Sequence, residues 1–289
     1  MSGKYTNITS YNKVRFNSSK NSTNRKAIYF YSFISILFLI SCFNEDSQSK
    51  SIQDSPFYNP AAEGFDLENS DPKAILIADS VMHAMGGRKN WDETNFIRWN
   101  FFGVRTLLWD KKNKLVRIDA EKDNYKAIVH LENDFGSIQK NGQVYTNQDS
   151  LKIYKNKAKS IWINDAYWLI MPFKLKDSGV VLKYIDEGTT EEGKNAHILE
   201  LRFKEVGNTP ENKYRVWVDK KDYLVSQWSF YQTADLEEPR FITPWGKYQP
   251  HGNILLSGYR GPDYILTEIE VFDTLPPIYE NAFVEFSEE

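Results

Sequence analysis

Few side chains in this sequence of 289 residues have the type and spacing that chemistry requires. Cys42 is the only cysteine, which excludes a disulfide framework and a zinc site built from several cysteines. The four histidines stand singly along the chain, and none shows the HExxH spacing of a helical metal site. The sequence therefore offers one modifiable sulfur and no metal centre.

The remaining residues form no recognisable catalytic grouping. The chain contains no GxSxG, P-loop or GxGxxG motif. Glu268 and Glu270 lie two residues apart on a predicted strand, so their carboxylates share one face. Such a pair is more typical of a solvated strand face than of acid–base catalysis. We therefore predict a protein that is not an enzyme and that uses no cofactor and no metal.

The residues before Cys42 have the layout of a secretory signal. Residues 1–26 carry six Lys or Arg and no Asp or Glu, and an uncharged apolar run follows from Ile28 to Ile40. That run is shorter than the roughly 20 apolar residues of a membrane-spanning helix. We predict that residues 1–41 are a signal peptide.

The residues around the expected cleavage point, Leu39-Ile40-Ser41-Cys42, resemble the bacterial lipobox. The resemblance implies that the Cys42 thiol takes a diacylglyceryl group and that cleavage exposes an N-terminus which is then acylated. Two or three acyl chains give stable anchoring where one gives only marginal binding. We therefore predict a lipoprotein of the outer membrane, facing the periplasm or the cell surface. A plain signal peptide with an incidental cysteine, or a short core helix, is the alternative.

Charge and hydropathy exclude other classes of protein. The formal net charge is −3, and removal of residues 1–41 takes it to −9. An acidic chain has no basic surface for nucleic acid and is repelled by anionic lipid, so the anchor would hold it at the membrane. A mean hydropathy of −0.56 excludes a polytopic membrane protein.

The mature chain divides into two parts by composition. Residues 42–70 are rich in Ser, Asn, Gln, Asp and Pro and show no period of 2 or 3.6, which predicts a flexible tether. Residues 71–289 are long enough for one β-rich domain. This domain opens with an expected helix over 72–85, with Pro72 in its first turn and Gly86-Gly87 at its end.

Alternating apolar residues then predict antiparallel strands. Residues 96–109 alternate clearly and predict one strand, or two with a bend near Gly103. Asn141-Gly142 is a strong hairpin signal. An apolar segment over 158–175 predicts a helix that Pro172 ends. Further strands are expected at 114–119, 124–132, 143–146, 180–186, 196–206, 213–219, 223–232, 253–259 and 263–272.

Three segments carry a family resemblance. They are Ala84–Gly87 with Trp91, Tyr167–Leu175 (YWLIMPFKL) and Tyr214–Asp219 (YRVWVD), and they resemble the LolA/LolB-type lipoprotein carriers and an uncharacterised lipoprotein branch of that superfamily. The resemblance implies an α+β fold, mainly β: a curved antiparallel half-open β-barrel covered by the N-terminal helix and a mid-chain helical lid. It also implies an apolar cavity for acyl chains. Soluble carriers have no lipid anchor, so an anchored chain is more similar to the receptor type.

The expected cavity provides the candidate binding site. A half-closed sheet cannot fill its inner face as tightly as a small closed barrel, and a helical lid can cover an apolar space that accepts alkyl chains. Ordinary core packing is the alternative for every candidate. The candidate cavity-lining residues are Trp99, Phe101, Leu107, Trp162, Trp168, Met171, Leu199, Leu201, Phe203, Ile269 and Val271.

A long loop at 236–252 provides a second candidate surface. It contains three prolines, and Arg240, Trp245 and Tyr248 suit a cavity rim or a contact with a partner protein. A rigid crossover between strands is the alternative. This loop and the acidic surface also favour a second function, in which the same scaffold serves as a structural or accessory module of an outer-membrane protein complex.

Overall fold

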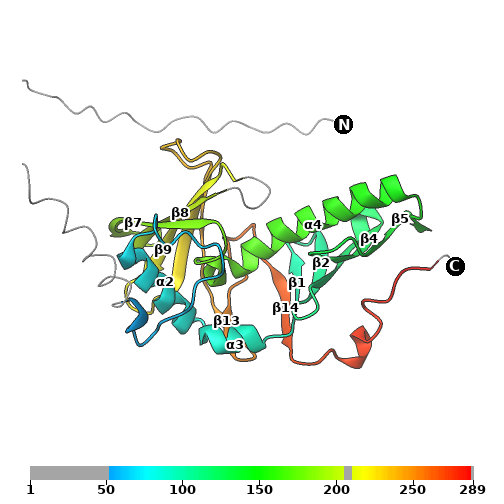
Figure 1. Cartoon of the computed structure of the whole chain (residues 1–289), viewed down its shortest axis with the longest axis horizontal. Helices are drawn as coiled ribbons and strands as arrows, with labels where there is room; N and C mark the ends of the chain where they lie inside the picture. Colours follow the sequence, from blue (N-terminus) through cyan, green and yellow to red (C-terminus); the bar gives the residue numbers. More distant parts are fainter. Residues whose placement is uncertain (1–51, 205–209, 288–289) are drawn as a thin grey trace, which may run out of the picture. The chain divides into compact units, whose positions relative to one another are not determined.

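The computed structural model describes residues 52–204 and 210–287, and antiparallel strands dominate this part of the chain (Figure 1). A seven-stranded sheet has the order β14-β1-β2-β3-β4-β5-β6. Its strands are β1 (Phe96–Phe101), β2 (Arg105–Asp110), β3 (Leu115–Ala120), β4 (Tyr125–His130), β5 (Gly136–Lys140), β6 (Gln143–Val144) and β14 (Thr267–Phe272). Each strand pairs antiparallel with its neighbours.

A five-stranded sheet with the order β11-β10-β9-β8-β7 is the second main sheet. Its strands are β7 (Val180–Thr189), β8 (Asn195–Phe203), β9 (Lys213–Asp219), β10 (Val225–Tyr231) and β11 (Phe241–Pro244). A short ribbon pairs β12 (Gln249–His251) with β13 (Ile254–Leu256). The predicted α+β class with open antiparallel sheets is thus confirmed, and the described strands are divided between two main sheets.

The turn residues predicted from sequence set the hairpins. Asn141 and Gly142 have φ values of 53° and 80°, the left-handed pair that a type I′ turn requires between β5 and β6. The expected bend near Gly103 separates β1 from β2, and Phe102 and Gly103 both adopt positive φ. These local signals therefore determined where the chain reverses.

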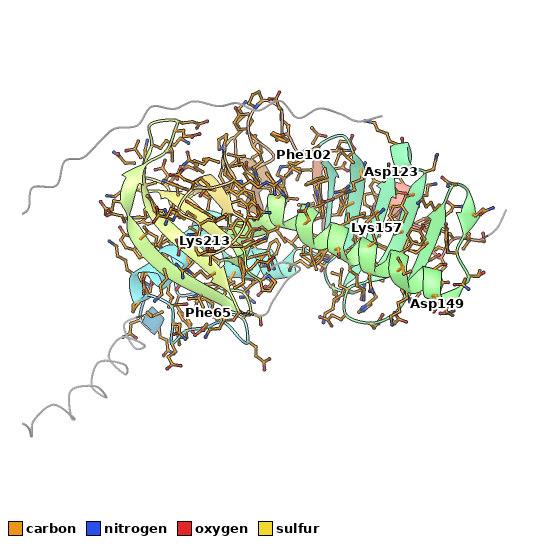
Figure 2. The ribbon with its side chains drawn as sticks, turned by 90° about the horizontal axis from the view of Figure 1, so that it is seen from above. Phe65, Phe102, Asp123, Asp149, Lys157 and Lys213 are labelled. Atoms are coloured by element: carbon orange, nitrogen blue, oxygen red, sulfur yellow. The ribbon has the colours of Figure 1, made fainter. Side chains whose placement is uncertain are left out.

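The helix α4 (Gln148–Ile170) covers the seven-stranded sheet and reaches the second sheet (Figure 2). It begins ten residues before the predicted start, because Asn147 caps it by accepting a hydrogen bond from the Ser150 amide at 3.1 Å. Pro172 follows its end and lies in a 3₁₀ turn, η2 (Met171–Lys174). The prediction that Pro172 ends this helix is confirmed.

A buried ion pair holds α4 on the sheet. Arg105 of β2 donates two hydrogen bonds to Asp165 of α4, at 2.5 and 2.8 Å. The Asp165 side chain is completely buried and that of Arg105 is 19% exposed. A bidentate pair of this kind sets both the position and the rotation of the helix.

The predicted helix over 72–85 is present as α2 (Pro72–Ala84), with Pro72 at its start. It packs against β7 and η2, and α3 (Gly87–Glu93) follows it. Asp71 does not cap α2 with its side chain. Its carboxylate instead accepts hydrogen bonds from the Tyr184 amide and the Lys183 ammonium, which fix the helix start to β7.

The expected tether 42–70 needs a correction over its C-terminal part. The Asp66 amide donates to the Val180 carbonyl, and the Ser70 hydroxyl accepts from the Leu182 amide, so this segment lies along the open edge of β7. Asn59 is buried, and its carbonyl accepts a hydrogen bond from Lys176. Polar residues paired with a strand edge show no hydrophobic period, which is why composition suggested a tether.

Removing the carboxylate of Asp165 tests the ion pair beneath α4. We expect Asp165→Ala to lower the free energy of unfolding by about 3–5 kcal/mol, because Arg105 is then left half-buried without its partner. Urea unfolding followed by circular dichroism measures the change. Lys114→Ala removes a solvent-exposed pair with Glu132 and should have little effect. Equal losses in the two variants would contradict the role of the buried pair.

Candidate functional site

A cavity of about 630 Å³ lies between the C-terminal half of α4 and the five-stranded sheet. Aromatic and aliphatic side chains form most of its wall, and polar side chains lie at a few positions. The lining consists of Trp162, Ile163, Asn164, Ala166, Tyr167, Trp168, Ile170, Lys174, Asp177, Ser178, Val180, Phe203, Asn212, Tyr214, Trp228, Phe230 and Phe241.

A row of aromatic residues across three strands makes the floor of this cavity. Tyr214 on β9 lies directly opposite Phe230 on β10, and Phe230 lies opposite Phe241 on β11. Their ring centroids are 5.3 Å apart for the first pair and 5.2 Å for the second. Directly opposed residues share one face of a sheet, so the register presents all three rings to α4.

The helix contributes the opposite wall. The Trp168 ring lies 4.8 Å from Trp228 in an edge-to-face contact and 5.6 Å from Phe241 in a stacked one. Tyr167 lies 5.2 Å from Tyr214. Aromatic contacts of this geometry stabilise beyond their buried area. They hold the helix against the sheet at one side of the cavity.

The cavity wall carries no unpaired charge. Lys174 and Asp177, the charged residues of the lining, form an ion pair with each other. Burial raises the pKa of Tyr214 to about 12 and raises the pKa of Tyr167 further above its usual value. Both phenols are therefore neutral at physiological pH, and the cavity suits an uncharged, apolar ligand portion.

Two polar atoms of the α4 wall remain without a hydrogen-bond partner. They are the Tyr167 hydroxyl and the Trp162 indole nitrogen, and both are shielded from solvent. A buried donor without a partner costs about 1–3 kcal/mol. This part of the wall is therefore less favourable to folding than the surrounding apolar contacts.

Three of the cavity-lining residues predicted from sequence, Trp162, Trp168 and Phe203, do line this cavity. The other candidates fill the core. Buried there are Trp99, Phe101, Leu107, Met171, Leu199 and Leu201, while Ile269 and Val271 are partly buried against it. For these positions ordinary packing, the alternative interpretation, describes the structure.

The aromatic floor was missed by the sequence prediction. Trp228 and Phe230 alternate within the predicted strand 223–232 and share one face, which was a usable signal. Tyr214 and Phe241 could not be assigned to the same face without the strand register. Strand pairing, which only the tertiary structure reveals, brings the row together.

The loop at 236–252, predicted to be a cavity rim or a partner contact, is buried at its centre. Trp245 is fully buried, stacks on the Arg260 guanidinium and cannot contact a partner. The Tyr248 hydroxyl donates to the Val225 carbonyl at 3.0 Å, and Arg240 is exposed. This proline-rich segment is therefore a packed crossover between strands. The prediction that Trp245 contacts a partner is wrong.

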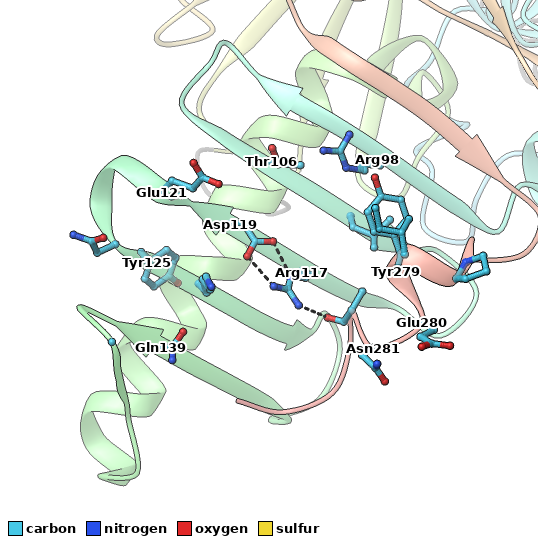
Figure 3. Close-up of a pocket in the computed structure, with 18 residues that line it drawn as sticks. Arg98, Thr106, Arg117, Asp119, Glu121, Tyr125, Gln139, Tyr279, Glu280 and Asn281 are labelled. Atoms are coloured by element: carbon cyan, nitrogen blue, oxygen red, sulfur yellow. Dashed lines mark hydrogen bonds and ion pairs between the residues drawn. The ribbon is translucent and has the colours of Figure 1, made fainter. Parts of the chain in front are cut away.

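A second hollow, of about 870 Å³, lies on the face of the seven-stranded sheet opposite α4, beneath residues 277–282 (Figure 3). Its arginines are already paired. Arg117 contacts Asp119 at 2.7 Å and donates to the Ala282 carbonyl at 3.1 Å. Arg98 lies between Glu268 and Glu270, at 2.8 and 3.0 Å. The predicted carboxylate pair is thus part of an ion-paired strand face.

The described residues were also compared with the requirements of a metal site and of a membrane-spanning helix. Within residues 52–204 and 210–287, no group of three or more His, Cys, Asp or Glu side chains is arranged to hold a metal ion. Over the same residues, no helix combines the length and apolarity needed to cross a bilayer. Cys42 and the predicted signal peptide fall outside these ranges.

Fold and cavity together define an α+β protein with open antiparallel sheets and an aromatic cavity beneath a helix. The chain belongs to the family of unknown function DUF6503, whose model matches residues 112–272. That match includes α4 and the strands of the cavity floor. No curated protein sequence matches the chain.

Three solved structures are similar to this chain at low sequence identity. A DUF1329 family protein from Desulfovibrio piger shares 13% identity, with a TM-score of 0.41 and coverage of 73% of this chain and 98% of that one. A putative outer membrane lipoprotein-sorting protein domain from Vibrio parahaemolyticus shares 11%, with a TM-score of 0.34 and coverage of 73% and 97%. A LolA superfamily protein from Nitrosomonas europaea shares 9%, with a TM-score of 0.34 and coverage of 70% and 96%.

Trp228 tests the packing of the cavity wall. Its ring is 1% exposed and its indole donates a hydrogen bond to Thr243. We expect Trp228→Ala to lower the free energy of unfolding by about 3–5 kcal/mol, because it removes a buried aromatic ring. Trp228→Phe keeps a ring and should cost about 1 kcal/mol for the lost hydrogen bond, plus a smaller packing loss. Guanidinium unfolding of both variants measures the difference, and equal costs would show that the ring does not pack the wall.

Proposed function

We propose that this protein is a lipid-anchored envelope protein that binds an acyl chain, from a lipid or a lipoprotein, in the cavity beneath α4. It acts as a carrier or receptor and catalyses no reaction. The observation that carries the proposal is the mainly aromatic lining of the cavity, in which the two charged residues, Lys174 and Asp177, neutralise each other. Alkyl chains gain about 0.8 kcal/mol for each methylene that such a lining removes from water.

The dimensions of the cavity suit this class of ligand. Ligand pockets in proteins commonly have volumes of about 300–1,000 Å³ and mostly apolar walls with a few polar groups. The volume of about 630 Å³ lies in that range. Asn164, Ser178, Asn212 and the Lys174–Asp177 pair are the polar part of the lining, and we assign the ligand's polar end to that part.

Anchoring belongs to the same proposal. We place the acyl chains of the anchor on Cys42, after removal of residues 1–41, and the protein at the outer membrane. Few residues separate Cys42 from the first described residue, Ile52, so the anchor would keep the domain close to the bilayer. A binding domain held there would meet lipid substrates at the membrane surface.

The alternative function, an accessory interaction module, drew on the loop at 236–252. The burial of Trp245 leaves this loop with fewer contact residues than its sequence suggests. The acyl-binding function is therefore the better supported of the two.

A charge placed on the cavity floor tests the proposal. We expect Phe230→Asp to weaken binding of a fluorescent fatty acid at least about tenfold, since a carboxylate in an apolar wall must be desolvated when the alkyl chain enters. Fluorescence titration of the full chain in mild detergent measures the affinity. Phe230→Leu keeps the wall apolar and should bind within a few-fold of the parent chain.

Val284→Asp is the matched control. It introduces the same charge at a position that is 60% exposed and outside the cavity lining, so binding should be unchanged. Circular dichroism confirms that each variant is folded. Equal affinity of the parent chain and the folded Phe230→Asp variant, or no probe binding by the parent chain, would refute acyl binding in this cavity.

A further inference from the structure

The outward face of α4 is an uncovered surface with an unusual composition. The inner face of the helix packs on β4 and β5, and residues 152, 153, 156, 157, 160, 163 and 164 are exposed. Ile153 is 67% exposed and Ile163 is 38% exposed, which is high for isoleucine. These positions recur every three or four residues, so they form one stripe along the helix.

Positive charge accompanies these isoleucines. Lys152, Lys157 and Lys159 lie along this part of the helix, and residues 150–164 contain no Asp or Glu. Lys155 is different, because it is buried and pairs with Asp134 at 2.9 Å. The helix's own carboxylates are Asp149, which is exposed in the first turn at the N-terminal end of this stripe, and Asp165, which is buried beneath the helix. The outward stripe is therefore basic and partly apolar.

Neighbouring elements add to this charge. Lys140 of β5 lies 5.3 Å from the Tyr154 ring, and Lys157 lies 5.4 Å from the Tyr125 ring. The Lys159 ammonium donates to the Asn133 carbonyl at 2.7 Å, which is a neutral partner. Asp134 pairs with Lys155, and the charges of Lys155, Lys159 and Lys152 together lower the pKa of its carboxyl. Positive charge thus exceeds negative charge around the helix, on a chain whose formal net charge is −3.

We propose that the outward face of α4, from Lys152 to Asn164, docks on a bilayer surface that contains anionic lipid. The lysines contact the headgroups, and Ile153 and Ile163 enter the boundary between headgroups and acyl chains. Interfacial helices combine lysines with large apolar residues in this way, and each lysine near an anionic surface strengthens binding about fivefold. A basic face on a chain of net negative charge also favours this orientation at an anionic surface.

The docking face continues into the cavity. Ile163 and Asn164 belong to the exposed stripe and also line the cavity. A helix lying on the bilayer along this face therefore brings the cavity lining next to the lipid. This inference extends the proposed function, because it supplies the side from which an acyl chain enters, although the docking itself depends only on the α4 surface.

Depth-dependent quenching tests the docking. A cysteine is introduced at Ile153, and the full chain is reconstituted into vesicles and labelled with an environment-sensitive fluorophore. The parent chain gives the background from Cys42. In phosphatidylcholine vesicles that contain phosphatidylglycerol, we expect brominated lipids to quench the label at position 153, and quenching to fall in phosphatidylcholine alone. A label at Ile278, which is 82% exposed and lies outside α4, is the matched control and should not be quenched.

Charge reversal supplies the second arm of the test. Lys152→Glu with Lys157→Glu should reduce quenching at position 153 to the level of the control site. Lys112→Glu with Lys221→Glu changes two exposed lysines in turns by the same charge and should leave quenching unchanged. Equal quenching at 153 and 278, or no effect of the α4 reversal, would overturn the docking. Fatty-acid titration of the same α4 variant in detergent separates the outcomes, because cavity binding should persist there if only docking is lost.

Discussion

The arrangement of the two main sheets and the cavity depends on one helix, α4, which packs against both sheets. A helix of 23 residues is long enough to cover the seven-stranded sheet with its first half and to reach the five-stranded sheet with its second. The bidentate contact between Arg105 of the seven-stranded sheet and Asp165 lies in the half of α4 that reaches the second sheet. Because it fixes the rotation of α4, it also determines which side chains face the second sheet.

The cavity exists because the two halves of α4 pack differently on the two sheets. Over the first sheet, α4 packs closely through small and apolar residues such as Ala158, which is fully buried. Over the second sheet, rings on both sides meet edge to face or stacked, and large rigid rings leave space that smaller flexible side chains would fill. The hollow is therefore a consequence of aromatic packing between two elements held at a fixed separation. Its mainly aromatic lining, without an unpaired charge, is what connects the fold to an apolar ligand.

Local signals in the sequence predicted much of the fold. Turns at Asn141-Gly142 and near Gly103, the start of α2 at Pro72 and the end of α4 before Pro172 depend on residues adjacent in the chain. Each is set by backbone geometry that a single residue type favours. The early start of α4 was missed because its first turns are polar, and the packing of residues 59–70 was missed because strand-edge hydrogen bonds leave no periodic pattern.

By itself, the sequence determined the antiparallel α+β class and the positions of most turns. It did not separate Trp162, Trp168 and Phe203, which lie in the cavity wall, from the candidates that fill the core. The tertiary structure alone decided that Tyr214, Phe230 and Phe241 form one row, because residues on three strands share a face only once the register is set. It also decided that Trp99 and Leu199 belong to the core. Periodicity shows that a side chain points inward, but whether it meets another side chain or a cavity depends on the element opposite.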